Sequence, residues 1–320
     1  MAINKAIRVA LKALSYPASM DLEKTFVAQR LFEVVKAPLS PLYKLWDHRI
    51  ERDGHEIRIR IYNPQEQADM RDDKRVLLFF HGGGWVHETI DTYNNVCRAL
   101  SRATGCRVAS VEYSRAPEHA FPQALEDCYS AARAIYQNPD EFDIEADEIM
   151  LIGDSAGGNL AAATSLMARD RGEFVISGQI LIYPATWYDH SATSPFQSVH
   201  DNGEDYLLTS KRIQEYMAWY AGDNPDCRFN PYFSPLNSTD FSNQPRTLVI
   251  TAEYDPLRDE GEAYAMKLRE AGNDAWYIRM PDMLHGYFAL PSRFAPVRQT
   301  HDIIISFLNG DIEKWLDKTY

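Results

Sequence analysis

The sequence contains few cysteines and lacks the motifs that bind metals or nucleotides. Its four cysteines (Cys97, Cys106, Cys128 and Cys227) show no C-x-x-C spacing, which argues against a zinc site or a disulfide framework. No H-E-x-x-H pair and no G-x-G-x-x-G fingerprint occurs, so no metal and no organic cofactor is expected. We therefore predict reduced, mostly buried thiols in a cytoplasmic protein.

Positive charge is also scarce, since 33 Lys and Arg residues stand against 46 Asp and Glu, giving a formal net charge of −13. Such an excess of negative charge disfavours nucleic acid and anionic membranes as partners. The 320 residues are 45% apolar and 25% charged, which is typical of a globular enzyme with a large core. The expected partner is a small molecule, and the sequence is compatible with a monomer or a homodimer.

Two glycine-containing motifs each follow an apolar run that is typical of a buried strand. HGGGW at 81–85 follows the run at 76–80, and GDSAG at 153–157 follows the run at 149–152. The second motif matches G-x-S-x-G, the sharp strand-to-helix turn that presents a serine hydroxyl. The first matches a loop whose backbone N–H groups receive a developing oxyanion. Together they predict an acyl-transferring hydrolase with Ser155 as its nucleophile.

A serine nucleophile needs a histidine base, which follows the serine along the chain in this fold class. Four histidines do so: His190, His200, His285 and His301. His285 follows a short strand predicted over residues 275–279 and lies in a strand-end loop, where a catalytic base is expected. His190 and His200 lie in an irregular polar stretch, and His301 lies in a predicted surface helix. We therefore predict His285 as the base.

The acid that orients this base is expected after the strand predicted over residues 246–252. Asp255 lies at the carboxyl end of that strand, and the next residue is a proline that ends the strand on a fixed turn. Three other acidic residues compete: Glu253, Asp259 and Asp282. Asp282 is too close to His285 in sequence to reach the far side of its ring, and Asp259 suits the first turn of the following helix. Asp255 is the predicted acid, with Glu253 as the fallback.

These motifs together resemble those of a known family, the hormone-sensitive-lipase branch of α/β-hydrolases, also called the bacterial family IV esterases. The similarity rests on HGGGW, GDSAGGNLA, RAPEH at 115–119, EYDPLRDEG at 253–261 and LHGY at 284–287. Asp154, before the serine, places the chain in the GDSAG group. The resemblance runs from about Leu45 to the C-terminus and departs at Tyr113-Ser114-Arg115, where many members have Tyr-Arg-Leu.

The resemblance implies a role for each matching residue. It implies a triad of Ser155, Asp255 and His285. It further implies oxyanion donors at Gly83, Gly84 and Ala156, with His81 and Gly82 shaping the loop. The implied fold is a single α/β-hydrolase domain over residues 1–320, with cap elements at about 1–44 and 185–222.

The order of predicted elements also favours an α/β fold. A hairpin is predicted over 45–51 and 56–62, with Asp53-Gly54 as its two-residue turn. After it, strands at 76–80, 106–113, 149–152 and 178–183 alternate with helices at 94–103, 124–137 and 159–169. Such alternation implies a mostly parallel sheet with helices on both faces and a site beyond the carboxyl ends of its strands.

Two segments outside this alternation are predicted to cover the site. Apolar residues from Ile3 to Leu14 recur at helical spacing, which favours a lid helix over a membrane-surface helix. About sixty residues separate Pro184 from Pro245, which is too long for a simple connection, and a helix is predicted there over 213–220. Four residues are candidates for lining the substrate pocket: Trp85, Tyr183, Leu207 and Tyr287.

The sequence thus predicts a serine carboxylesterase that hydrolyses short-chain acyl esters through an acyl-enzyme. A deacetylase or an amidase of the same fold would use the same residues. A hydrolase-fold protein that acts mainly by binding a ligand or another protein is a further alternative. Receptors that resemble this family have lost the catalytic histidine, whereas His285 is present here.

Overall fold

The structure is a computed structural model that describes residues 47–64, 75–142, 144 and 148–316. The cap element predicted at 1–44, including its amphipathic helix, lies outside the described residues. The first two residues of the predicted hairpin, Leu45 and Trp46, also lie outside them. These assignments therefore stay predictions.

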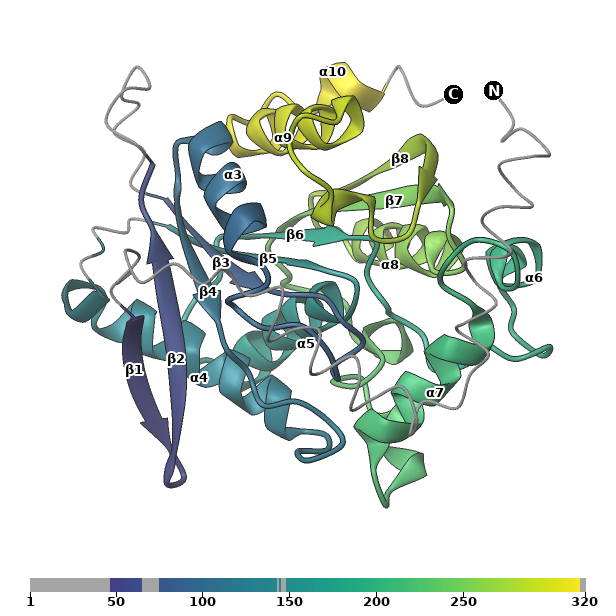
Figure 1. Ribbon diagram of the computed structural model, residues 1–320, viewed down its shortest axis with the longest axis horizontal. Helices are drawn as coiled ribbons and strands as arrows, with labels where there is room; N and C mark the ends of the chain where they lie inside the picture. The colour runs from purple at the N-terminus through teal and green to yellow at the C-terminus, as the bar shows by residue number, and fades with distance from the viewer. Residues whose placement is uncertain (1–46, 65–74, 143, 145–147, 317–320) are drawn as a thin grey trace.

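Eight strands of the described chain form one sheet in the order β1-β2-β4-β3-β5-β6-β7-β8 (Figure 1). Their bounds are β1 (Asp47–Arg52), β2 (His55–Tyr62), β3 (Val76–Phe80), β4 (Arg107–Val111), β5 (Ile149–Asp154), β6 (Gly178–Ile182), β7 (Arg246–Tyr254) and β8 (Ala275–Leu284). β1, β2 and β4 pair antiparallel, and every pair from β4 onward to β8 is parallel. The predicted mostly parallel sheet is confirmed.

The hairpin β1–β2 has the predicted two-residue turn. Arg52 pairs with His55, so only Asp53 and Gly54 connect the strands. Both residues have positive φ, at 50° and 81°, as expected where the turn must match the twist of the two strands.

Helices cover both faces of the sheet. They are α3 (Asn94–Thr104), α4 (Gln123–Gln137), α5 (Ala156–Arg171), α8 (Arg258–Glu270) and α9 (Ala295–Leu308), with the short α10 (Glu313–Leu316) after them. Figure 1 shows α3 and α9 on one side of the sheet and α4 and α5 on the other. Side chains alternate between the two cores: Leu77 and Phe79 of β3 join the core under α3 and α9, whereas Leu78 and Phe80 join the core over α5.

Two details differ from the sequence-based prediction. β8 continues to Leu284, five residues beyond the predicted end, because it pairs with β7 past an irregularity between Ala252 and Tyr254. His301 lies on the predicted helix but is only 5% exposed, so its side chain belongs to the core. Burial lowers the pKa of its imidazole to about 4. As predicted, the cysteines are mostly buried: three of the four are, and no two of them form a disulfide.

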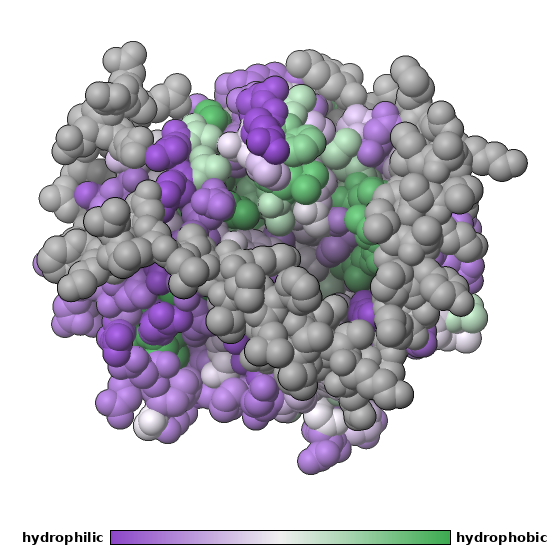
Figure 2. All heavy atoms as spheres, in the orientation of Figure 1, coloured by the Kyte–Doolittle hydropathy of each residue, from purple (hydrophilic) through white to green (hydrophobic). Residues whose placement is uncertain are grey.

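On the face that Figure 2 shows, hydrophobic side chains gather near the upper centre, around β8 and the loop after it. Leu290 and Phe294 of that loop are 48% and 44% exposed. Within the described ranges, no helix is both long and apolar enough to span a bilayer.

The segment between β6 and β7 contains α6 (Gln197–Asn202), α7 (Ser210–Ala221) and the 3₁₀ turns η3 (Pro225–Phe229) and η4 (Pro235–Asn237). The start of this segment is tied to α8 by Glu260, whose side chain is fully buried. Its carboxylate accepts hydrogen bonds from Thr186 N–H at 2.6 Å and Trp187 N–H at 3.1 Å, and it contacts His190 Nε2 at 2.6 Å. One buried carboxylate thereby fixes the first turn of this long insertion.

Glu260→Ala is expected to lower the free energy of unfolding by about 3–5 kcal/mol, because it leaves a buried imidazole and two N–H groups without their acceptor. Urea unfolding followed by circular dichroism measures the loss. The control is Glu270→Ala on the same helix, whose side chain is 65% exposed and which should cost far less. Equal losses from the two variants would contradict the importance of the buried contact.

Candidate active site

Ser155 lies in a strained turn between β5 and α5, which we call the serine turn (residues 153–157). Its φ and ψ are 57° and −119°, a conformation that a non-glycine residue rarely adopts. The flanking glycines are required by contact: a Cβ on Gly157 would lie 2.0 Å from the Phe80 carbonyl oxygen, and one on Gly153 would lie 2.3 Å from the Gly157 carbonyl oxygen. The serine turn is therefore built directly against the end of β3.

The structure brings together the three side chains that the sequence analysis selected. His285 Nε2 lies 2.8 Å from Ser155 Oγ, and His285 Nδ1 lies 2.7 Å from Asp255 Oδ2. Asp255 is fully buried, and its other oxygen accepts the N–H of Leu257 at 2.9 Å. The carboxylate is thus held from both sides, with one oxygen aimed at the imidazole.

The competing acids and histidines have other partners. Glu253 accepts the N–H of Asp282 at 2.6 Å, and Asp259, in the first turn of α8, accepts the N–H of Ser198 at 2.7 Å. His190 contacts Glu260, and His200 Nε2 lies 2.9 Å from the Ser194 carbonyl oxygen. The His200 contact lies within the segment between β6 and β7, and the His190 contact joins that segment to α8.

The HGGGW segment, which we call the glycine loop (residues 81–85), follows β3 and lies beside the serine turn, because β3 and β5 are neighbours with Phe80 opposite Gly153. Gly83 and Gly84 have φ of 114° and 62°. A Cβ on Gly83 would lie 2.3 Å from the His87 carbonyl oxygen, and one on Gly84 would lie 2.5 Å from the Tyr216 ring. Only glycine fits at either position.

Two further residues fix the glycine loop. His81 is buried and stacks on the Tyr113 ring with 4.3 Å between ring centroids, while the Tyr113 hydroxyl donates to the His81 carbonyl oxygen at 2.6 Å. Gly82 donates its N–H to Asp154 Oδ1 at 2.9 Å.

Ala156, the first residue of α5, has an N–H that the helix itself leaves without an acceptor.

Asp154 is a residue that the sequence analysis used only to assign the chain to the GDSAG group, without giving it a role in the site. It is 2% exposed, although its carboxylate lies next to the nucleophile in the chain. Burial raises the pKa of its carboxyl to about 6, against the opposing effects of the Tyr93 hydroxyl, the His285 side chain and the Gly82 N–H. The signal that could have found it was its position inside the GDSAG motif, since an acidic residue packed between two turns needs hydrogen-bond donors.

The four candidate pocket residues differ in exposure. Trp85 is 2% exposed and stacks on Tyr220 of α7 at 4.8 Å, nearly parallel at 4°. Tyr183 is fully buried with its ring centroid 4.7 Å from that of His285, and Tyr287 is also buried. Leu207, between α6 and α7, is 40% exposed. Trp85, Tyr183 and Leu207 all have positive φ, and such strain is common at functional sites. Their role as pocket lining stays a prediction.

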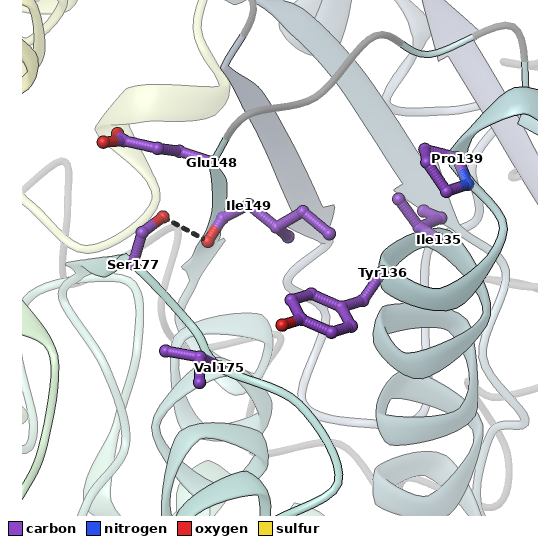
Figure 3. A pocket seen from close by; sticks show the side chains of 7 residues that line it. All are labelled: Ile135, Tyr136, Pro139, Glu148, Ile149, Val175 and Ser177. Atoms are coloured by element: carbon purple, nitrogen blue, oxygen red, sulfur yellow. Dashed lines mark hydrogen bonds between the residues drawn. The ribbon is translucent and has the colours of Figure 1, made fainter.

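A separate pocket of about 230 Å³ lies at the opposite edge of the sheet (Figure 3). It is lined by Ile135, Tyr136, Pro139, Glu148, Ile149, Val175 and Ser177. Ser177 Oγ donates to the Ile149 carbonyl oxygen at 2.7 Å across it. Ile149 begins β5 whereas Ser155 follows its end, so about 20 Å of strand separates the pocket from the serine. This pocket is therefore not part of the candidate active site.

A mostly parallel sheet with a serine, a histidine and an aspartate in hydrogen-bond contact beyond its strand ends defines an α/β protein with a hydrolase-like site. A profile of the alpha/beta hydrolase fold matches residues 77–289, and the chain belongs to this family. The resemblance found in the sequence is thereby confirmed.

The relatives of this chain are named as esterases. An arylesterase of Saccharolobus solfataricus is 38% identical over 255 residues, covering 79% of this chain and 80% of that protein. An ethyl acetate hydrolase of Pseudomonas putida is 35% identical, covering 75% of this chain and 74% of that protein. The solved structure of a hyperthermophilic esterase from the archaeon Pyrobaculum calidifontis matches with a TM-score of 0.78 and 37% identity, covering 98% of this chain and 99% of that one.

Gly157→Ala is expected to cost about 3 kcal/mol or more of unfolding free energy, because the new methyl group would meet backbone atoms of β3 that cannot move aside. Thermal and urea unfolding measure the loss. The control is Gly172→Ala after α5, where φ is 65° and no atom lies within 4 Å of the new Cβ. In that variant only the positive φ of a non-glycine residue is unfavourable, so the expected loss of unfolding free energy is about 1 kcal/mol. Similar losses in the two variants would show that the close approach to β3 is unimportant.

Proposed function

We propose that this chain is a serine carboxylesterase that hydrolyses short-chain acyl esters through an acyl-enzyme. The observation that carries the proposal is the hydrogen-bonded series from Ser155 through His285 to Asp255, with distances of 2.8 and 2.7 Å. The series lies in a family member whose relatives include an arylesterase and an ethyl acetate hydrolase. Carboxylic ester hydrolysis is the activity that this membership indicates, and the residue roles are our inference.

In the first step, His285 Nε2 accepts the proton of Ser155 Oγ as this oxygen attacks the ester carbonyl. The developing oxyanion accepts hydrogen bonds from the N–H groups of Gly83, Gly84 and Ala156. Asp255 holds the proton of His285 Nδ1 in place and stabilises the imidazolium that forms. The imidazolium then gives its proton to the leaving alcohol, which departs as the acyl-enzyme forms.

In the second step, His285 takes a proton from water, which attacks the acyl-enzyme carbonyl. The same three N–H groups stabilise the second oxyanion, and Ser155 leaves with the proton from His285. The acid product is released and the serine hydroxyl is restored. No other reactant is required.

The segment at 185–222 is proposed to act as a cap over this site. Tyr216 of α7 lies directly against Gly84, and Tyr220 of the same helix stacks on Trp85. Phe233 packs on the same tryptophan with ring centroids 6.0 Å apart. An aromatic group this close to the glycine loop limits the room beside the nucleophile.

Ser155→Ala is expected to lower kcat for p-nitrophenyl butyrate by on the order of 10⁶-fold, as loss of a triad nucleophile does in subtilisin. The fold should be retained, because the hydroxyl lies at the surface of the turn rather than in the core. The control is Ser177→Ala, which removes a hydroxyl at the opposite sheet edge and should keep wild-type kcat. A Ser155→Ala variant that retained a tenth of the wild-type rate would exclude this serine as nucleophile.

The preferred acyl chain is expected to be short. Each added CH₂ contributes about 0.8 kcal/mol only while the pocket has room. We therefore expect kcat/KM for p-nitrophenyl esters to rise over the first few carbons, peak at about butyryl to hexanoyl and fall with longer chains, which must displace the cap. A steady rise to dodecanoyl, or strong activation by emulsified triglyceride, would identify a lipase instead.

The alternatives are separated by substrate. A deacetylase or amidase would cleave acetylated sugars or anilides with a higher kcat/KM than matched esters. A protein that acts mainly by binding would show no turnover that depends on Ser155.

A further inference from the structure

We propose that Asp154 is a positioning residue that holds the glycine loop, the serine turn and the loop carrying His285 in one arrangement. The inference rests on the proposed function and extends it to a residue outside the triad. Its basis is a single buried carboxylate with hydrogen-bond partners on three separate segments of the chain. We call residues 285–294 the histidine loop, because they connect β8 to α9.

The first connection runs to the glycine loop. Asp154 Oδ1 accepts the N–H of Gly82 at 2.9 Å, and Gly82 directly precedes the two glycines proposed as oxyanion donors. The fit is close, since a Cβ on Gly82 would lie 2.8 Å from Asp154 Oδ2 and 3.0 Å from the Tyr93 hydroxyl. Asp154 therefore sets the distance between the glycine loop and the serine turn to which it belongs.

The second connection runs to the histidine loop through Tyr183. The Tyr183 hydroxyl donates to Asp154 Oδ2 at 3.5 Å and accepts the N–H of Phe288 at 3.2 Å. Its ring lies against His285, with 4.7 Å between centroids. A shift of the Asp154 side chain would thus displace His285 as well as the proposed oxyanion donors of the glycine loop.

A third partner closes the set. The Tyr93 hydroxyl, directly before α3, donates to Asp154 Oδ2 at 2.9 Å. All four groups are buried or glycine backbone, so the carboxylate and its hydrogen-bond donors are shielded from bulk water. An ionised carboxylate suits this position because its three hydrogen-bond partners, Gly82, Tyr93 and Tyr183, all donate to it.

The charge of Asp154 is kept at a cost to stability. Because burial raises its pKa from 3.8 to about 6, the contribution to stability present below pH 3.8 is lost as the pH rises through about 6. The titratable groups that interact with it are Tyr93, Tyr113, Tyr183, Cys97, Glu88 and His285. Of these, Glu88 opposes the ionised form and His285 favours it. A buried charge retained against a stability cost is typical of a functional site.

The test compares two buried aspartates changed in the same way. Asp154→Asn keeps one acceptor for Gly82 but turns the other oxygen into a donor that faces two tyrosine hydroxyls. Its control is Asp127→Asn: Asp127 is also fully buried and accepts three hydrogen bonds, from Arg52 at 3.0 Å, His55 at 2.9 Å and the Ser114 N–H at 2.9 Å. None of these partners belongs to the three segments that Asp154 joins.

We expect Asp154→Asn to lower kcat by about 10- to 100-fold with KM changed less than about threefold, because misplaced oxyanion donors act on the transition state rather than on substrate binding. Asp127→Asn should lower thermal stability and leave kcat per folded molecule within twofold of wild type. Equal kcat losses in both variants, or an unchanged kcat in Asp154→Asn, would overturn the proposal.

A second readout addresses the oxyanion donors directly. In a thionoester, sulfur replaces the carbonyl oxygen of the ester. Because sulfur accepts hydrogen bonds weakly, aligned N–H donors stabilise the transition state of the ester more than that of the thionoester. The ratio of kcat for the ester to kcat for the thionoester should be smaller in Asp154→Asn than in the wild type, and unchanged in Asp127→Asn. If Asp154 had a purely structural role, its substitution would lower kcat equally for the ester and the thionoester, and the ratio of the two kcat values would not change.

The pH dependence gives a third readout. The ratio of wild-type to Asp154→Asn kcat should fall as the pH drops through about 6, because wild-type Asp154 is then protonated too. A ratio that is constant from pH 5 to 8 would overturn the role of the ionised carboxylate.

If Asp154→Asn does not fold, Tyr93→Phe and Tyr183→Phe test the same network, since each removes one donor while keeping the carboxylate. Either should lower kcat by about 3- to 10-fold and reduce the ratio of kcat for the ester to kcat for the thionoester. Wild-type values in both would contradict the proposal. Failure of the proposed function itself has a different signature, namely a wild-type protein whose ester hydrolysis does not depend on Ser155.

Discussion

The close approach of α5 to the end of β3 is the constraint on which the site depends. The backbone at Gly157 lies so near the Phe80 carbonyl oxygen that no side chain fits between them. The chain enters this contact through the positive-φ conformation at Ser155, and the start of α5 lies beside the glycine loop. The serine hydroxyl and the glycine loop are therefore neighbours because the backbones of α5 and β3 lie in direct contact, rather than because long side chains reach across a gap.

The other residues of the site come from β6, β7 and β8, which lie on the opposite side of β5 from β3. β6 and β7 follow β5 in the sheet order, so their carboxyl ends deliver Tyr183 and Asp255 to the same edge. β8 carries His285 at its end and reaches the serine only because it extends past the irregularity beside Ala252. The histidine bridges the acid and the serine although they are separated by 100 positions in the chain.

Much of this could be predicted from local sequence. The hairpin was marked by Asp53-Gly54, and the strands and the serine turn by apolar runs that end in glycine motifs. Other features depended on pairing and packing that no local pattern records. The length of β8 is set by its partner β7, and the burial of His301 is set by the fit of α9 on the sheet. The hydrogen bonds of Asp154 escaped notice because its partners Gly82, Tyr93 and Tyr183 are spread over about a hundred residues.

The contact of Glu260 with residues 186–190 has a consequence for how such proteins diversify. The first residues of the segment between β6 and β7 are held by hydrogen bonds to Glu260, which lies on α8 and therefore outside the segment. An exchange of this whole segment between relatives would separate the two halves of the contact, whereas an exchange confined to residues 197–221 would leave them together. The Glu260 contact thus stays intact when only α6 and α7 are exchanged, provided that the incoming residues still supply a donor to Asp259, which here accepts the N–H of Ser198.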